Sequence, residues 1–231
     1  MLRDILEWDI GTWARCLSFW APVVSGLAPS TARVLAVGER NGGLSLWFAL
    51  QGFHVICSDV GGPTNQAREL HAKYRVAELV TYADVNIFAM PYPENTFEVV
   101  ASKSVIGGLK KIRKDPSTRT LENQRLAVGE IQRVLKPGGH FLGAENLRGS
   151  WLHQKVRTFA KNGRLGWRHL RREEIDSLFA PFAAVEQQCY GFLGSRFHLL
   201  GLNHLTSFVD SWLCPLLPPQ SLYVSFIRAR K

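Results

Sequence analysis

The chain has 231 residues, 46% of them hydrophobic and 20% charged, and this size and composition indicate one globular domain with a sizeable core. It contains no run of about 18 apolar residues and no secretory leader, which argues against a membrane-spanning or secreted protein, so we expect a cytoplasmic one. The formal charge of +9 predicts an anionic partner without identifying it.

The cysteines are widely spaced and form no C-x-x-C pair, so the sequence predicts neither a zinc site nor a disulfide framework. Reduced thiols inside the fold are the simpler interpretation. They are Cys16, Cys57, Cys189 and Cys214. No metal ion is expected in this protein.

The N-terminal region, residues 1–30, is predicted to be a helical cap within a single domain that spans residues 1–231. Residues 2–20 have the pattern of an amphipathic helix rich in tryptophan, and Pro22 and Pro29 separate it from the next element. A helix ahead of the first strand can lie over a ligand cleft. The alternative is that its tryptophans pack on the core, and the sequence does not decide between the two.

The segment Val34–Leu46 reads as a buried strand, a glycine-containing turn and the start of a helix over 44–50. Glycine allows the backbone to approach a ligand, and the N–H groups at the start of the helix face the crevice at the carboxyl ends of the strands. The turn does not spell G-x-G-x-x-G, so this signal is weak when taken alone. The turn residues predicted to contact a ligand are Gly38, Glu39, Arg40, Asn41 and Gly42.

A second strand over 53–58 strengthens this interpretation because it ends at Asp59, about 20 residues after the first glycine. An acid at this place can accept hydrogen bonds from the ribose hydroxyls of an adenosine-containing cofactor. Val60 follows it at the same site. A helix over 65–77 and a short strand over 78–82 come next, and Asp84 follows that strand.

Residues 83–102 contain an acid, a proline-bearing loop, a short acidic turn and a Phe-Glu-Val-Val strand. This order resembles the class I S-adenosylmethionine-dependent methyltransferases of the type 11 group. The resemblance implies that Asp84 accepts a hydrogen bond from the adenine amino group and that Val85 lies beside the ring. It extends to a Leu-Lys-Pro-Gly-Gly turn at residues 135–139, where proline and glycine allow the chain to reverse into a strand.

The resemblance implies an α/β fold, a Rossmann-like doubly wound sheet of seven mostly parallel strands with an antiparallel last strand. Residues 33–146 would form the cofactor-binding core, and 147–231 the acceptor-side helices and terminal strands, with strands over 184–191 and 221–228. The cofactor would be S-adenosyl-L-methionine, and its product S-adenosyl-L-homocysteine. Residues 103–108 and 144–154 are similar to a subset of these enzymes from bacterial glycan and secondary-metabolite pathways.

Two positions depart from the family pattern. The family usually has an acid where this chain has Ala36, and a second glycine where it has Arg40. The acid helps to hold the amino end of the methionine part. Either Glu39 substitutes for it or the cofactor binds more weakly, and the sequence leaves both open.

Methyl transfer from a sulfonium requires alignment of the acceptor, whereas a hydroxyl acceptor also benefits from a general base and an amine must be neutral. Candidates at or just beyond the ends of the fourth and fifth strands are Lys103, which also faces the cofactor, Glu145 and His153. Glu145 could instead anchor a loop through backbone N–H groups, and His153 could be a hydrogen-bonded packing residue.

Basic residues cluster after the fourth and fifth strands and predict a small-molecule acceptor that carries phosphate or carboxylate, or one on an anionic lipid surface; a plain solvated face is the alternative. They are Lys110, Lys111, Arg113 and Lys114, then Lys155, Arg157, Lys161, Arg164, Arg168, Arg171 and Arg172. The apolar stretch 197–217 reads as a lid or subunit contact, with peripheral membrane contact as the minority interpretation, because it is too interrupted to span a bilayer.

These patterns together predict a methyltransferase that acts on a small molecule or on a glycan or secondary-metabolite precursor, at oxygen or nitrogen. An RNA methyltransferase is a weaker alternative, since the chain has no Asn/Asp-Pro-Pro-Tyr/Phe tetrapeptide for a flipped base. The departures at Ala36 and Arg40 prompt a third interpretation, a non-catalytic scaffold. A dehydrogenase that uses NAD fits less well, for want of G-x-G-x-x-G. The sequence does not predict an oligomeric state.

Overall fold

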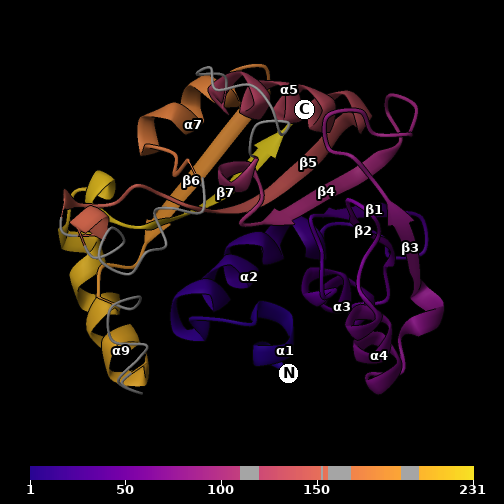
Figure 1. Cartoon of the computed structure of the whole chain (residues 1–231), viewed down its shortest axis with the longest axis horizontal. Coiled ribbons are helices and arrows are strands. Elements are labelled where there is room, and N and C mark those ends of the chain that lie inside the picture. Colours follow the sequence, from indigo (N-terminus) through magenta and orange to yellow (C-terminus); the bar gives the residue numbers. More distant parts are fainter. Residues whose placement is uncertain (110–119, 152, 156–167, 194–202) are drawn as a thin grey trace.

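The computed structural model describes residues 1–109, 120–151, 153–155, 168–193 and 203–231. A seven-stranded sheet runs through the described part of the chain, with helices on both of its faces (Figure 1). The strands lie in the order β3-β2-β1-β4-β5-β7-β6, and β7 is antiparallel to both of its neighbours. The strands are β1 Arg33–Val37, β2 His54–Asp59, β3 Val80–Asp84, β4 Phe97–Lys103, β5 Leu135–Asn146, β6 Ala184–Tyr190 and β7 Val224–Arg230. This confirms the predicted fold class.

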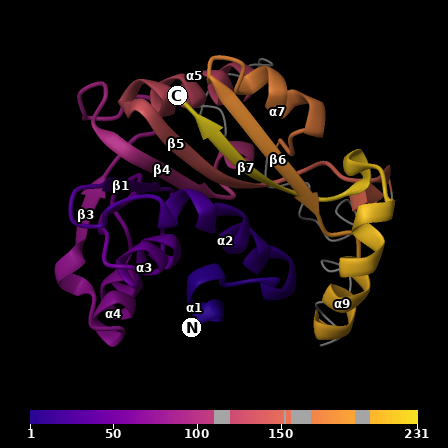
Figure 2. The same ribbon diagram turned by 180° about the vertical axis from the view of Figure 1, so that it is seen from behind.

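The helices form two layers that bury the two faces of the sheet. Figure 2 shows α5 and α7 on one side, and α2, α3 and α4 on the other. Within the described residues the α-helices are α1 Leu2–Leu6, α2 Ile10–Ser25, α3 Gly43–Ala49, α4 Asn65–Lys73, α5 Thr120–Val134, α7 Arg172–Leu178 and α9 Asn203–Leu213. Short 3-10 turns are η1 Ala77–Leu79, η2 Ile106–Gly108, η5 Cys214–Leu216 and η6 Pro219–Ser221. None of the helices in this part of the chain is both long and apolar enough to cross a membrane.

The central strand β1 explains why two cores form. Val34 and Ala36 belong to the core that contains the tryptophans of α2, whereas Leu35 and Val37 belong to the core beneath α5 and α7. Successive side chains of a strand point to opposite faces, so a strand covered on both sides must be apolar throughout. All four of these residues are buried.

The N-terminal prediction was wrong in its bounds. Instead of one helix over 2–20, the chain forms α1 and α2, and positive φ angles at Glu7 (67°) and Asp9 (40°) break the helix between them. The Tyr223 hydroxyl donates a hydrogen bond of 2.6 Å to the Asp9 carboxylate and holds this break in place. Pro22 lies inside α2, which continues to Ser25, so Pro22 does not separate the helix from the sheet.

Other bounds also shift, and the last strand runs over Val224–Arg230 and not over 221–228, because residues 219–221 form a 3-10 turn. The helix predicted over 65–77 ends at Lys73, because Arg75 adopts a φ of 57°, which a helix cannot continue. Asp84 is the last residue of β3 and does not follow it. At the Pro-Gly-Gly turn, β5 starts directly after α5, and Gly138 has a φ of 78°. A Cβ on Gly139 would lie 2.9 Å from the Lys136 carbonyl oxygen, which excludes a side chain there.

Candidate active site

The turn after β1 is built so that only glycine fits at its two ends. Gly38 has a φ of 69°, and a Cβ there would lie 2.4 Å from Cγ2 of Val105. Gly42 has a φ of 76°, and its Cβ would lie 2.7 Å from Cε1 of His71. The turn from Gly38 to Gly42 lines a cleft, as a loop that holds a ligand requires.

Asp59 and Asp84 lie side by side at the carboxyl ends of β2 and β3, where they are register partners. The backbone N–H of Val60 donates to Asp59 at 2.8 Å, and the N–H of Gly61 donates to Asp84 at 2.8 Å. A single turn therefore orients both carboxylates at one edge of the sheet.

Two cavities meet at the Gly38 turn. The smaller cavity has a volume of about 230 Å³ and is lined in part by Asp59. The larger cleft has a volume of about 630 Å³. Both are lined in part by Gly38 and Ser104. Of the predicted cofactor residues, Gly38, Asp59, Val60 and Val85 line the smaller cavity, and Gly38, Glu39, Arg40, Asn41, Gly42 and Lys103 line the larger cleft. Asp84 lines neither of the two.

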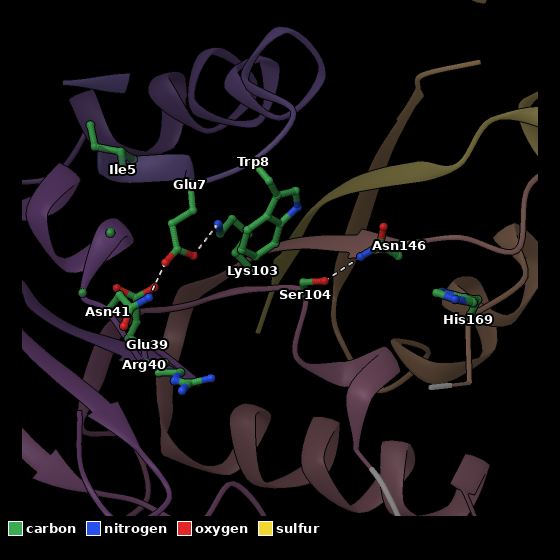
Figure 3. Close-up of a pocket in the computed structure, with 13 residues that line it drawn as sticks. Ile5, Glu7, Trp8, Glu39, Arg40, Asn41, Lys103, Ser104, Asn146 and His169 are labelled. Atoms are coloured by element: carbon green, nitrogen blue, oxygen red, sulfur yellow. Dashed lines mark hydrogen bonds and ion pairs between the residues drawn. The ribbon is translucent and has the colours of Figure 1, made fainter. Parts of the chain in front are cut away.

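Helix α1 forms one wall of the larger cleft (Figure 3). Glu7 accepts a hydrogen bond of 2.6 Å from the Asn41 amide, and one of its carboxylate oxygens lies 3.5 Å from Nζ of Lys103. Trp8 also faces the cleft, whereas Trp13 is buried in the core. The two interpretations of the N-terminal helices therefore both apply, each to a different tryptophan.

Lys103 is held by this wall. Its Nζ donates to the Leu6 carbonyl oxygen at 2.6 Å and lies 3.6 Å from the centroid of the Trp8 ring. Burial lowers the pKa of Lys103, while the carboxylates of Glu7 and Glu39 oppose this shift. The side chain thus links β4 to α1 across the cleft.

Glu39 is the buried carboxylate of the cleft. Its Oε2 accepts hydrogen bonds from the Ser45 backbone N–H at 2.9 Å and from the Ser45 hydroxyl at 3.2 Å. Burial raises the pKa of Glu39, and the Ser45 N–H opposes this. Ala36 is fully buried in β1 and does not line the cleft. Glu39, which follows Gly38, is the acid that the turn places in the cleft.

Glu145 anchors the segment after β4. Its carboxylate accepts hydrogen bonds from the backbone N–H groups of Val105 at 2.9 Å, Ile106 at 2.8 Å and Gly107 at 3.1 Å. Burial raises the pKa of Glu145 to about 7, against the effect of these three donors. Glu145 does not line either cavity, and this geometry fits the loop-anchor alternative.

His153 is also away from the cleft lining. It is buried, its Nδ1 lies 2.8 Å from the Ser150 hydroxyl, and its Nε2 lies 2.9 Å from the Phe192 carbonyl oxygen. Both ring nitrogens are engaged, as in a packing histidine. A role for His153 as a base stays a prediction to which the geometry adds no support.

The sequence did not indicate the cleft residues Glu7, Trp8, Ser104 and Asn146. Asn146 donates to the Ser104 hydroxyl at 2.5 Å, and these two residues lie where β4 and β5 end. Ser104 has a φ of 60°, which is uncommon for a residue other than glycine. Their place at adjoining strand ends was the available signal, because ligands of such sheets bind there.

The predicted basic entrance is only partly described. Lys110, Lys111, Arg113, Lys114, Arg157, Lys161 and Arg164 lie outside the described residues. Arg168 pairs with Glu174, and Arg172 pairs with Asp176. The lysine and arginine side chains that line the cleft within the described ranges are Arg40 and Lys103. Among the described residues, no three His, Cys, Asp or Glu side chains gather as they would around a metal ion.

Two curated relatives match this chain over part of their length. EEF1A lysine methyltransferase 4 of Bos taurus is 27% identical over 138 residues, which cover 58% of this chain and 52% of the relative. Glycine/sarcosine/dimethylglycine N-methyltransferase of Actinopolyspora halophila is 28% identical over 181 residues, which cover 78% of this chain and 26% of the relative. The matches thus span about half, or less, of these relatives.

A solved structure has a similar fold. Phosphoethanolamine N-methyltransferase 2 of Haemonchus contortus, in complex with phosphomonomethylethanolamine and S-adenosylhomocysteine, superposes with a TM-score of 0.64 at 20% identity. The superposition covers 95% of this chain and 53% of that one. A family described as methyltransferase domain matches residues 35–143, which contain the Gly38 turn, Asp59 and Asp84. Residues 35–143 therefore match the methyltransferase domain family, in line with the resemblance to class I enzymes of the type 11 group.

Proposed function

We propose that this protein is an S-adenosylmethionine-dependent methyltransferase that acts at nitrogen or oxygen of a small molecule or of a glycan or secondary-metabolite precursor. The observation that carries the proposal is the pair formed by Asp59 and Asp84 beside the Gly38 turn. Two carboxylates on neighbouring strands, next to a glycine turn that lines a cleft, suit the hydroxyl and amino donors of an adenosine.

Each part of the cofactor has a proposed set of contacts. Asp59 would accept from the ribose hydroxyls and Asp84 from the adenine amino group, with the buried side chain of Val85 beside the ring. The Gly38 to Gly42 backbone would hold the methionine part. In place of an acid at position 36, Glu39 would attract the methionine ammonium, since it is the buried carboxylate of that cleft.

S-adenosylmethionine supplies an electrophilic methyl group on a positively charged sulfur. The protein has to align the acceptor and exclude water, which is the positioning contribution to catalysis. Helix α1 covers the cleft with Trp8, and Ser104 and Asn146 present polar atoms from the ends of β4 and β5. We assign the acceptor to the space between these groups.

Nitrogen is the better supported acceptor atom. The carboxylate of Glu7 and the ring of Trp8 line the same cleft, where both already contact the ammonium group of Lys103. The names of the two relatives and of the similar solved structure specify lysine, glycine or sarcosine, and phosphoethanolamine as the compounds that are methylated. Each of these compounds carries an amino group. An amine must be neutral to attack, so the rate should rise with pH until the acceptor has lost its proton.

Binding of S-adenosylhomocysteine, followed by isothermal titration calorimetry, tests the cofactor assignment. Asp59→Asn and Asp84→Asn should each weaken binding by about ten-fold or more, because each removes a charged hydrogen-bond acceptor. Glu69→Gln, an exposed acid on α4, is the matched control and should bind like the wild type. Absence of heat for the wild-type protein, or wild-type affinity in the double variant, would refute the proposal.

A further inference from the structure

Helix α9 and the 3-10 turn η5 that follows it present their side chains in an inverted arrangement. Thr206, Asp210 and Cys214 follow one another at four-residue spacing and are buried. Phe208, Trp212 and Leu216, at the same spacing, are 64%, 71% and 82% exposed, and we call them the outer stripe. A helix that packs on a core normally buries its apolar side and exposes its polar side.

Hydrogen bonds fix this orientation. The Asp210 carboxylate accepts from the backbone N–H groups of Phe192 and Leu193, both at 3.0 Å. The Ser207 hydroxyl donates to the Gly11 carbonyl oxygen of α2 at 3.1 Å. Rotating α9 to bury the outer stripe would break these contacts, so the exposure of the stripe is a built-in property of the fold.

A further exposed pair, one aromatic and one basic, lies in the segment around residue 150. This segment lies beside α9 in both views (Figures 1 and 2), and His153 bonds the carbonyl oxygen of Phe192, whose backbone N–H donates to Asp210 of α9. In this segment Trp151 is 65% exposed, and Nζ of Lys155 lies 4.9 Å from the centroid of its ring.

A hollow of about 210 Å³ adjoins the segment around residue 150, since Arg148, Gly149 and Gln154 line it. It is lined by three arginines and by Gln220, which follows the stripe in the chain. Arg172 is paired with Asp176, and one acid, Glu173, also lines the hollow. Arg148 and Arg171 are exposed and give the hollow its positive charge.

We propose that this docking face, made of the outer stripe, Trp151 with Lys155, and the arginine hollow, binds the surface of an anionic phospholipid membrane. Exposed tryptophan and phenylalanine suit the boundary between head groups and acyl chains, and arginine and lysine suit lipid phosphates. The 11 residues of α9 would lie flat in this boundary. The net charge of +9 attracts the whole molecule to such a surface.

Lipid fits the docking face better than a second copy of the chain does. In a symmetric dimer the same patch meets itself, so Arg148, Arg171 and Lys155 of both copies would be brought together. Like charges in an interface disfavour association, whereas lipid phosphates would neutralise them. This inference does not depend on methyl transfer.

Co-sedimentation of the full chain with vesicles tests the inference. Vesicles of phosphatidylcholine and phosphatidylglycerol at a ratio of about two to one should bind the wild type, and phosphatidylcholine alone should bind it at least about ten-fold more weakly. The double variant Phe208→Ser with Trp212→Ser should lose about ten-fold or more of the partition constant. Leu126→Ser is the matched control, an exposed leucine (56%) on α5, and should bind like the wild type.

A second pair of changes tests the charged part. Arg148→Gln with Arg171→Gln should weaken binding to the anionic vesicles and reduce its dependence on salt. All substituted residues are exposed, so unchanged circular dichroism and melting temperature should accompany each loss. The inference is overturned if the wild type does not bind anionic vesicles, or if the stripe variant binds as well. It is also overturned if sedimentation velocity shows that the wild type is a dimer and the stripe variant is a monomer.

Discussion

The two halves of the sheet differ in where they place large apolar side chains. Around β1, β2 and β3 most apolar side chains are buried, Asp59 and Asp84 lie at the strand ends, and the buried acid Glu39 lines the larger cleft. Around β6 and β7 an acid, Asp210, is buried and the large apolar side chains of α9 are exposed. The first half keeps most of its apolar side chains inside, whereas α9 in the second half exposes Phe208 and Trp212. A departure of this kind marks a surface that serves contact with something outside the chain.

Glu145, which lies between the two halves of the sheet, is expected to have the largest effect on the free energy of unfolding. Its pKa rises from 4.5 to about 7 in the folded protein, so the folded state favours the neutral carboxyl group. The stabilisation is complete below pH 4.5 and is lost as the pH rises to about 7. At about 1.4 kcal/mol per pH unit this amounts to about 3 kcal/mol.

Urea unfolding of the wild type and Glu145→Gln, from about pH 5 to about pH 8, measures this loss. The wild type should lose stability relative to the variant across this range, and the contribution of Glu39 cancels because both proteins have it. A constant difference between the two would mean that the three N–H donors keep Glu145 ionised.

Gly38→Ala tests, in the half of the sheet around β1, β2 and β3, whether the turn after β1 contacts the ligand. The new Cβ has to move Val105 and to occupy a φ of 69°, so the turn should distort. We expect S-adenosylhomocysteine to bind about a hundred-fold more weakly, which corresponds to about 2.7 kcal/mol. Calorimetry checks this, and wild-type affinity in the variant would show that the turn does not contact the ligand.

Asp210→Ala probes the other half. It leaves the N–H groups of Phe192 and Leu193 without their carboxylate, so the free energy of unfolding should fall by about 2 kcal/mol. Limited proteolysis should then cut near α9 sooner. Asp176→Ala, at a side chain that is 55% exposed, is the matched control and should change stability by less than about 0.5 kcal/mol. Equal losses in the two variants would remove the special role of Asp210.

Gly129→Ala should have the smallest effect and the opposite sign. Gly129 lies inside α5, and a Cβ there meets no atom within 4 Å. Alanine is the better helix former, so the free energy of unfolding should rise by about 0.5 to 1 kcal/mol with unchanged cofactor affinity. A loss of stability in Gly129→Ala would show that the free space around a glycine does not decide the effect of replacing it, for Gly129 or for Gly38.

The sequence predicted the first half well because local rules determine it. A buried strand, a glycine turn and an acid at the next strand end follow from spacing and from the conformations that glycine allows, and the resemblance to class I methyltransferases is confirmed. The predicted sheet with its antiparallel last strand is confirmed as well. The assignments of Asp59, Asp84 and the turn to parts of the cofactor stay predictions.

The rest depends on contacts between distant parts of the chain. Glu7 and Trp8 reach the cleft only because the chain breaks between α1 and α2, and a hydrogen bond from Tyr223, near the C-terminus, holds that break. Periodicity could not reveal this. In the stretch 197–217, hydropathy alone could not tell which side chains face outward, because Asp210 finds its partners on another segment.

The turn formed by Val60 and Gly61 has a consequence for how this family can diversify. The spacing of the two acids is set by main-chain N–H groups, one to Asp59 and one to Asp84, and not by the side chain of residue 60. That side chain is 71% exposed and lines the smaller cavity. Mutation at this single position can therefore change the rim of the smaller cavity while the distance between the two acids stays the same.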